Sequence, residues 1–333
     1  MIAQVDSNYF KTRPSAAFRR IATRIFFEGR PLTTKARWIN SLYLLQFALE
    51  KKLPALKPVI KPIFIIGVGR SGTTILGTLL SMHPQVGFLN EPKAIWHTIY
   101  PEEDVIGHYD LGPARYRLDM EDASRIVKRN ASRLFGDYLA LTFSERLLDK
   151  NPELTFRVPF IQAIFPDAKF IFLVRNGWNT CNSIDKWSRS YAVRIKGETH
   201  DWWGVNDRKW QLLIEQVVKP DPLFREMLPA IAELQDNRDR AAVEWIVTIR
   251  EGLAQFTQHP NSIMLLQYEQ LLAQPRQKLT ELLEFCELPA DEKVFAYAEG
   301  SLRPSTKHHR FALHPILQPL FETTLAELGY TSV

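Results

Sequence analysis

The segment IFIIGVGRSGTT, residues 63–74, decides the fold of this chain. It opens with the continuous apolar run Ile63–Gly69, which is typical of a parallel strand buried on both faces. An amphipathic helix is expected to follow over residues 73–83. Between the two, closely spaced glycines allow the backbone to turn tightly and to point its N–H groups at an anion near the helix N-terminus. We therefore predict a loop that binds a phosphate-like group.

This loop departs from the loop of the nucleotide triphosphatases, whose pattern is G-x-x-x-x-G-K-[ST]. Gly67, Gly72 and Thr74 fit that pattern, but Thr73 stands at the position of the lysine. In the triphosphatases the lysine contacts the terminal phosphates close to a Mg²⁺ ion. Here the cation is Arg70, inside the loop. The loop therefore predicts a site for one phosphate that carries a compact anionic group, with no metal ion.

Strand and helix patterns alternate along the rest of the chain. Further buried strands are expected at residues 86–89, 169–175 and 262–268, and helices near residues 179–190, 240–259 and 276–286. This alternation is typical of a parallel sheet with right-handed crossovers. We predict an α/β fold in which a P-loop-like parallel β-sheet is flanked by helices, as a single domain over residues 61–333, preceded by a helical N-terminal extension.

The extension, residues 1–60, is strongly basic. It holds 11 Lys and Arg against three acidic residues, a balance of +8 in a chain whose net charge is +5. Helices are expected near residues 16–27 and 34–51, and the second carries an apolar stripe that we expect to pack on the body: Trp38, Leu42, Leu45 and Leu49. The positive charge is compatible with weak contact to a membrane surface, with an acidic partner or with solvated faces. A nucleic-acid partner is not indicated, because the rest of the chain is near neutral.

Nothing near the N-terminus indicates export or membrane insertion. The opening MIAQVDSNYFKTRPS lacks the apolar core of a signal peptide, and the longest uncharged stretch near the N-terminus, residues 38–49, has 12 residues and is too short to span a bilayer. The two cysteines, Cys181 and Cys286, are too few for a disulfide framework and are expected as buried thiols. We expect a soluble, cytoplasmic protein whose oligomeric state the sequence does not determine.

A second anion site is predicted at the end of another strand. Arg175 closes the apolar run KFIFLVR, and Ser183 follows eight residues later in the next helix. In doubly wound sheets, ligands bind beyond the carboxyl ends of the strands. Arg175 and Ser183 can hold a phosphate there, the arginine through charge-assisted hydrogen bonds.

Together these segments resemble the sulfotransferases that use 3′-phosphoadenosine 5′-phosphosulfate (PAPS), and most closely the branch that contains tyrosylprotein sulfotransferases and many bacterial enzymes. The run Arg70-Ser71-Gly72-Thr73-Thr74 resembles their 5′-phosphosulfate loop, and Arg175 with Ser183 resembles their 3′-phosphate motif. The resemblance extends from about residue 62 to residue 290. It implies that residues 61–333 are a sulfotransferase domain that uses PAPS as co-substrate and requires no metal.

Two more segments resemble nucleotide-binding parts of this family. Tyr268, in QYEQLL, resembles a Y-E-x-L segment and is expected to contact the nucleotide, although a tyrosine at a strand end is as often a core residue. Residues 303–307, RPSTK, resemble a loop that closes over the 3′-phosphate, which implies that Ser305 and Lys307 bind the co-substrate.

The resemblance also implies the catalytic groups. Glu91 follows the short strand at residues 86–89 and matches a catalytic glutamate of the branch, so we predict that it is the general base. Lys150, in the segment DKNP, stands where the branch has a lysine in an N-K-D-P-like segment. Lys150 and the loop cation Arg70 are predicted to stabilise the charge that develops on the departing nucleotide, 3′,5′-phosphoadenosine (PAP).

A histidine base, as in the cytosolic sulfotransferases of phenols and steroids, is disfavoured. Their base lies shortly before the second phosphate motif, and no histidine occurs here from Pro152 to Arg175. His97 and His108 are the next candidates.

The acceptor is the part on which the sequence is least informative. Five of the eight tryptophans fall between residues 178 and 210 and favour either an acceptor wall or the packing of a helical subdomain: Trp178, Trp187, Trp202, Trp203 and Trp210. We expect a small-molecule acceptor with a hydroxyl or amine group; phenols, alcohols, sugars and amines all stay open. The alternatives are a kinase-like nucleotide phosphotransferase, and a non-catalytic nucleotide-binding protein at a membrane surface.

Overall fold

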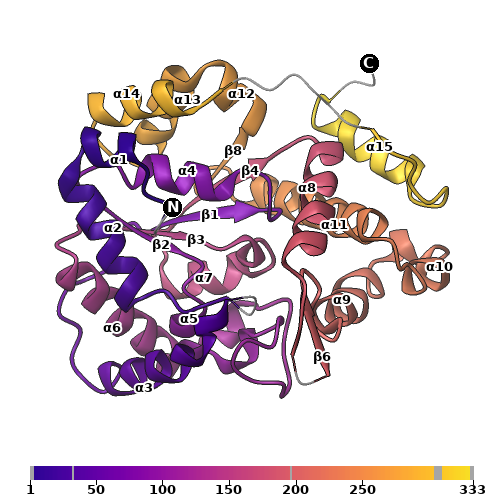
Figure 1. The fold of residues 1–333 in the computed structure, drawn as a ribbon, viewed down its shortest axis with the longest axis horizontal. Helices are drawn as coiled ribbons and strands as arrows, with labels where there is room; N and C mark the ends of the chain where they lie inside the picture. Colours follow the sequence, from indigo (N-terminus) through magenta and orange to yellow (C-terminus); the bar gives the residue numbers. More distant parts are fainter. Residues whose placement is uncertain (1–3, 32–33, 196, 304–309, 331–333) are drawn as a thin grey trace.

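A five-stranded parallel β-sheet forms the centre of the computed structural model, which describes residues 4–31, 34–195, 197–303 and 310–330 (Figure 1). In spatial order the strands are β2 (Val86–Asn90), β3 (Arg146–Lys150), β1 (Ile63–Gly67), β4 (Lys169–Val174) and β8 (Ile263–Gln267). Each neighbouring pair is parallel. The predicted fold class, a parallel sheet flanked by helices with a helical N-terminal extension, is confirmed.

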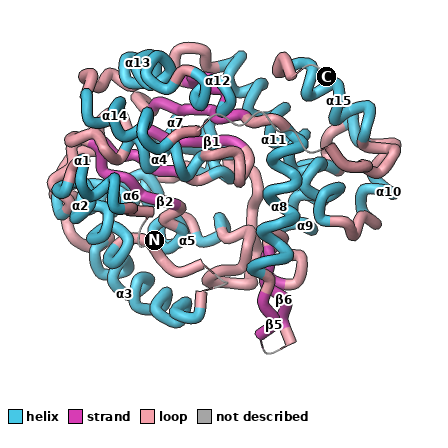
Figure 2. The backbone as a smooth tube through the Cα atoms, turned by 45° about the horizontal axis from the view of Figure 1, so that its top comes forward, coloured by secondary structure: helices cyan, strands magenta, loops and turns pink. Residues whose placement is uncertain are grey.

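The α-helices surround this sheet. They are α1 (Ser7–Thr12), α2 (Pro14–Phe26), α3 (Asn40–Glu50), α4 (Thr73–Leu80), α5 (Lys93–Ile99), α6 (Arg125–Leu141), α7 (Val158–Ile164), α8 (Gly177–Tyr191), α9 (Arg208–Leu213), α10 (Leu228–Ala232), α11 (Asn237–Gln258), α12 (Tyr268–Ala273), α13 (Pro275–Phe285), α14 (Glu292–Ser301) and α15 (Gln318–Glu327). A small antiparallel sheet of β5 (Val193–Ile195), β6 (Glu198–Asp201) and β7 (Gly204–Val205) protrudes next to α8 and α9 (Figure 2).

The alternation of side chains along β1 explains the two helical layers. Ile63 and Ile65 belong to one buried cluster, which includes side chains of α1, α4, α13 and α14. Phe64 and Ile66 belong to another, which includes α6, α7, α8 and α11. Because successive residues of a strand point to opposite faces, a strand that is apolar throughout needs cover on both sides. Every residue of β1 is buried.

Strand β3 is the central element that the sequence pattern did not predict. Its sequence RLLDK carries charge at both ends, so it lacks the continuous apolar run of the other strands. Nevertheless β3 lies between β1 and β2, and its Asp149 is fully buried. The indole Nε1 of Trp96 donates a 2.6 Å hydrogen bond to Asp149 Oδ2, which compensates part of that burial. The four predicted strands occur as β1, β2, β4 and β8, with ends shifted by at most two residues.

The N-terminal extension is packed into the body through buried charges. Arg20 and Glu28 form an ion pair with a 2.6 Å contact, and both side chains are 1% exposed. The Arg20 guanidinium also lies 4.7 Å from the ring centroid of Phe88 in β2. Glu28 Oε1 in turn accepts a 2.6 Å hydrogen bond from the backbone N–H of Asn90. The extension therefore supports the carboxyl end of β2.

The expectation that the apolar stripe of the extension packs on the body is wrong. All four of its members are 55 to 68% exposed: Trp38, Leu42, Leu45 and Leu49. The face of α3 that packs inward carries Tyr43 and Phe47, which are 4% and 0% exposed. Helical spacing identified an apolar face, but the two aromatic rings fill the space against the body. Among the described residues, no helix has the length and apolar character needed to cross a membrane.

Candidate functional site

The loop between β1 and α4 has the backbone conformation that its glycines predict. Gly67 and Gly72 have φ angles of 134° and 95°, which a side chain disfavours. A Cβ at Gly67 would lie 2.4 Å from the carbonyl oxygen of Leu173, and one at Gly72 would lie 2.4 Å from the ring of Tyr268. Both conformation and space therefore require glycine at these positions. The predicted neighbour Tyr268, the first residue of α12, packs directly against the loop.

Two buried polar atoms of this region have no hydrogen-bond partner within the described residues: Ser71 Oγ and Arg175 Nε. Leaving such an atom unpaired costs about 1–3 kcal/mol, so each is suited to a ligand. Arg175 Nη1 donates a 3.1 Å hydrogen bond to the carbonyl oxygen of Arg70, and the guanidinium lies 4.9 Å from the ring centroid of Tyr268. These residues fit the anionic groups of a nucleotide.

The two predicted anion sites are brought together. Arg70 Nε, in the loop, donates a 3.2 Å hydrogen bond to Ser183 Oγ, in α8, and Arg175 lies at the end of β4. Burial, with the nearby charge of Arg175, lowers the pKa of Arg70. A multiply charged anion would relieve that repulsion. The predicted Ser305 and Lys307 lie outside the described residues.

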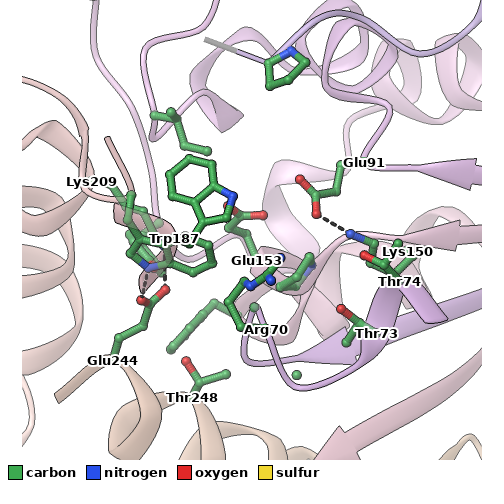
Figure 3. A pocket seen from close by; sticks show the side chains of 18 of the residues that line it. Arg70, Thr73, Thr74, Glu91, Lys150, Glu153, Trp187, Lys209, Glu244 and Thr248 are labelled. Carbon is green, nitrogen blue, oxygen red and sulfur yellow. Dashed lines mark hydrogen bonds and ion pairs between the residues drawn. The ribbon is translucent and has the colours of Figure 1, made fainter. Parts of the chain in front are cut away.

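Glu91 and Lys150 form an ion pair at the carboxyl ends of β2 and β3 (Figure 3). The neighbouring strands bring the two residues together, and their backbones are also paired: the N–H of Glu91 donates a 2.8 Å hydrogen bond to the Lys150 carbonyl. The Lys150 side chain is 2% exposed and that of Glu91 is 42% exposed. Burial alone would raise the pKa of Glu91, but the positive charges of Lys150 and Lys93 outweigh burial and lower that pKa below its usual value. Glu91 is therefore a carboxylate at neutral pH.

A second carboxylate, Glu153, lies in the same region and was missed by sequence reasoning. Its Oε2 lies 2.7 Å from Lys93 Nζ, which also contacts Asn151 Oδ1 at 3.1 Å. Burial would raise the pKa of Glu153, but Lys93 and Lys209 bring it well below its usual value. Its position directly after Pro152, in the segment that contains Lys150, was the available signal.

A cavity with about 970 Å³ of empty space, open solvent included, joins the loop to the ion pair (Figure 3). Its polar lining includes Arg70, Thr73, Thr74, Glu91, Lys150, Glu153, Lys209 and Glu244. Its apolar lining includes Ile106, Tyr116, Phe156, Trp187 and Trp202. The cavity thus combines an anion loop, two carboxylates and an aromatic wall, as ligand sites commonly do.

The five tryptophans divide between the two roles that the sequence left open. Trp187 and Trp202 line the cavity, with ring centroids 5.4 Å apart in an edge-to-face arrangement. Trp178, Trp203 and Trp210 belong to the buried core. A side chain on Gly69 would collide with the Trp202 ring, since a Cβ there would lie 2.5 Å from it. Trp202 therefore rests on the phosphate loop.

Two buried charges hold Trp202 in place, and neither had a sequence signal. Trp202 Nε1 donates a 2.6 Å hydrogen bond to Glu244 Oε2, in α11. Lys209 Nζ, in α9, lies 2.5 Å from Glu244 Oε1 and 4.6 Å from the centroid of the Trp202 ring. The wall is thus assembled from elements that are far apart in the chain.

The two histidines kept as alternative bases differ in position. His108 lines the cavity, and burial lowers its pKa below the usual value. His97 stacks on Tyr109, with ring centroids 5.1 Å apart. Of the two, His108 is the one placed near the ion pair.

Comparison with known proteins finds similarity to one family. The profile of the Sulfotransferase family matches residues 62–217. The chain is 24% identical over 241 residues to protein-tyrosine sulfotransferase A of Caenorhabditis elegans, covering 71% of this chain and 52% of that protein. It is 32% identical over 131 residues to nodulation protein NoeE of Sinorhizobium fredii, covering 36% and 30% of the two chains. The chain thus spans about a third to about half of the length of these relatives.

A solved sulfotransferase, STF1 from Mycobacterium tuberculosis, is 14% identical, with a TM-score of 0.46 over 96% of this chain and 93% of that one. The family match rests on the sequence profile, whose segment contains the phosphate loop, Glu91, Lys150, Arg175 and Ser183. Over residues 62–217, this chain is similar to the sulfotransferase family.

Proposed function

We propose that this protein transfers a sulfuryl group from PAPS to a hydroxyl or amine of a small-molecule acceptor. The observation that carries the proposal is the Glu91–Lys150 ion pair, which lines one cavity with the phosphate loop. The match of residues 62–217 to the profile of the Sulfotransferase family supports the same chemistry. A kinase-like activity is disfavoured because the lysine position of the loop holds Thr73.

The donor would be held by residues that fit its anionic groups. The loop from Arg70 to Thr74 fits the 5′-phosphosulfate, and its Ser71 Oγ has no hydrogen-bond partner among the described residues. Arg175, whose Nε likewise has no partner in the described part of the chain, and Ser183 fit the 3′-phosphate. Tyr268 borders both groups through its contacts with Gly72 and Arg175. When bound, PAPS supplies an activated sulfuryl group.

The ion pair provides a base and a stabilising cation. Glu91, a carboxylate at neutral pH, would accept the proton of the acceptor, which is worth about 10²–10⁴-fold in rate. As the new S–O or S–N bond forms, the bond to the bridging oxygen of the phosphate breaks and leaves PAP. Lys150 and Arg70 would stabilise the charge on that oxygen. The pairing of Lys150 with Glu91 keeps the base ionised before substrates bind.

The aromatic wall supports an acceptor of limited size. Trp202 packs on the phosphate loop, and Trp187 packs on Trp202, so the two rings line the space beside Glu91. Aromatic surface with a few polar groups is typical of small-molecule sites. Some relatives are named protein-tyrosine sulfotransferases, so a tyrosine peptide is the essential comparison.

A cytoplasmic location stays a prediction from the sequence.

Calorimetry and a transfer assay test this proposal. We expect tight binding of PAP without Mg²⁺ and weak binding of ADP and ATP under the same conditions. Label from ³⁵S-PAPS should then move to one of 2-naphthol, hexanol, hexylamine and glucosamine in preference to a tyrosine peptide. Binding of ATP that requires Mg²⁺ would favour the kinase-like alternative, and PAP binding without transfer to any acceptor would favour the non-catalytic one.

A further inference from the structure

Exposed apolar side chains are concentrated in the last part of the N-terminal extension. Between residues 38 and 60, seven large apolar side chains are 53 to 68% exposed: Trp38, Leu42, Leu45, Leu49, Leu53, Leu56 and Ile60. They include the four residues of the stripe described above, and from here on the apolar stripe means all seven. Scattered exposed apolar residues are ordinary, whereas such a concentration marks an interaction surface.

The stripe is held outward by the opposite face of α3. Tyr43 and Phe47 are buried in the core, and the Tyr43 hydroxyl donates a hydrogen bond to the carbonyl oxygen of Ile25. Asn40 Nδ2 donates a 3.0 Å hydrogen bond to the carbonyl oxygen of Arg30. Rotating α3 to cover its leucines would expose these aromatic rings. Figures 1 and 2 both show α3 at the periphery of the molecule, away from the central sheet.

Cations border the apolar stripe. Residues 29–62 contain seven Lys and Arg and one acid, Glu50, whose carboxylate accepts a 2.8 Å hydrogen bond from Gln46. Lys35 precedes Trp38 by three residues and Lys52 follows Leu49 by three, so exposed cations stand at both ends of α3. Neither forms an ion pair with any residue that the structure describes. The exposed face of α3 is therefore apolar along its length, and a cation stands at each end of the helix.

We propose that the apolar stripe docks this protein on the surface of an anionic lipid bilayer. Leucines on one helix face can enter the boundary of the acyl chains while lysines at the edges reach the phosphate groups. Trp38, at one end, suits the headgroup level. A second copy of this chain is the weaker occupant, because a twofold contact would bring Lys35 and Lys52 against like charges.

Vesicle flotation of the full chain tests the proposal. We expect the wild type to float with vesicles of phosphatidylglycerol and phosphatidylcholine, and less with pure phosphatidylcholine or at high salt. The triple variant Leu42→Gln, Leu45→Gln, Leu49→Gln should lower the bound fraction by about tenfold or more. The variant Lys35→Gln, Lys52→Gln should lose the preference for the anionic vesicles.

The matched control is Leu111→Gln with Leu223→Gln, whose side chains are 56% and 40% exposed on other elements. It should float like the wild type. Thermal melts and PAP binding of every variant show whether folding or the donor site has changed, so this test is separate from that of the proposed function. Absence of wild-type flotation, or equal flotation of the triple variant, overturns the proposal. So does a wild-type dimer that the triple variant converts to a monomer.

Discussion

At the scale of single residues, Glu91 combines an uncommon backbone conformation with a charged partner. Its φ of 55° lies in the left-handed region, where a non-glycine side chain costs about 1–3 kcal/mol. Such strain is concentrated at functional sites because the surroundings must maintain it. Here the surroundings are β3, through the hydrogen bond of Glu91 to the Lys150 backbone and the ion pair of their side chains.

Glu91→Gln should therefore remove the proposed base and leave the donor site intact. We expect PAP affinity close to wild type and a kcat lower by about 10²-fold or more with a hydroxyl acceptor, because the amide cannot accept a proton. Single-turnover transfer from PAPS measures the effect. The matched control is Glu153→Gln, the other carboxylate of the cavity. A larger loss in that control, with normal turnover of Glu91→Gln, would assign the base to Glu153.

Arg175→Ala should weaken PAP selectively through the 3′-phosphate. Losing a charge-assisted contact costs about 1.5–3 kcal/mol, which is roughly a ten- to hundredfold change in Kd. Adenosine 5′-phosphosulfate, which lacks the 3′-phosphate, should lose much less affinity. Arg189→Ala is the control, since Arg189 is 63% exposed and pairs with Asp185 of the same helix, α8. Equal losses for the two nucleotides would remove Arg175 from the 3′-phosphate site.

At the scale of elements, the N-terminal extension and β2 depend on each other. All matched motifs follow residue 60, so the sequence predicts that the extension is dispensable for the chemical step. The contacts lead us to the opposite expectation. Glu28 accepts a hydrogen bond from the backbone N–H of Asn90, the residue directly before Glu91, and Pro31 lines the same cavity as Glu91. The extension thus supports the strand end that carries the proposed base.

Glu28→Gln should consequently impair both stability and turnover. Breaking a buried ion pair leaves the Arg20 charge uncompensated and costs about 3–5 kcal/mol. Urea denaturation measures that loss, and kcat at a temperature where the variant is folded measures the effect on Glu91. The control is Glu287→Gln, because Glu287 is 47% exposed in its pair with Lys61 and should contribute little. Normal kcat in folded Glu28→Gln would limit Glu28 to a structural role.

At the scale of the whole molecule, the stability of the fold should depend on pH through Asp149. Burial raises its pKa from 3.8 to about 7, against the opposing effects of Trp96, Lys93 and Lys150. The folded protein therefore retains a proton on Asp149 that the unfolded chain releases above about pH 4. The contribution of Asp149 to stability is greatest below that pH, declines as the pH rises toward 7, and is constant above it.

Asp149→Asn should remove this dependence while its carbonyl oxygen still accepts the hydrogen bond of Trp96. Between about pH 5 and about pH 8, we expect the unfolding free energy of the wild type to fall by a few kcal/mol relative to that of the variant. This change corresponds to about 1.4 kcal/mol per pKa unit. Urea denaturation without nucleotide, at both pH values, measures it. A difference that does not change with pH would show that Asp149 has an ordinary pKa.

Taken by itself, the sequence determined the features that reside within one element and its adjoining turn. An apolar run followed by a glycine loop and a helix predicted β1, the loop and α4, because strand burial and turn chemistry depend on neighbouring residues. Glu91 and Arg175 were identifiable for the same reason: each directly follows a strand, and the carboxyl ends of parallel strands meet at one edge of the sheet.

The tertiary structure alone decided which faces are buried and which distant charges meet. Spacing could not show that Tyr43 and Phe47, rather than the leucines of α3, face the body, since both sets are apolar at helical intervals. Nor could it show that Trp202 rests on the loop through Glu244 and Lys209, which come from α11 and α9. Burial and charge pairing between remote segments depend on how the elements assemble, and the residue pattern within one element contains no information about that assembly.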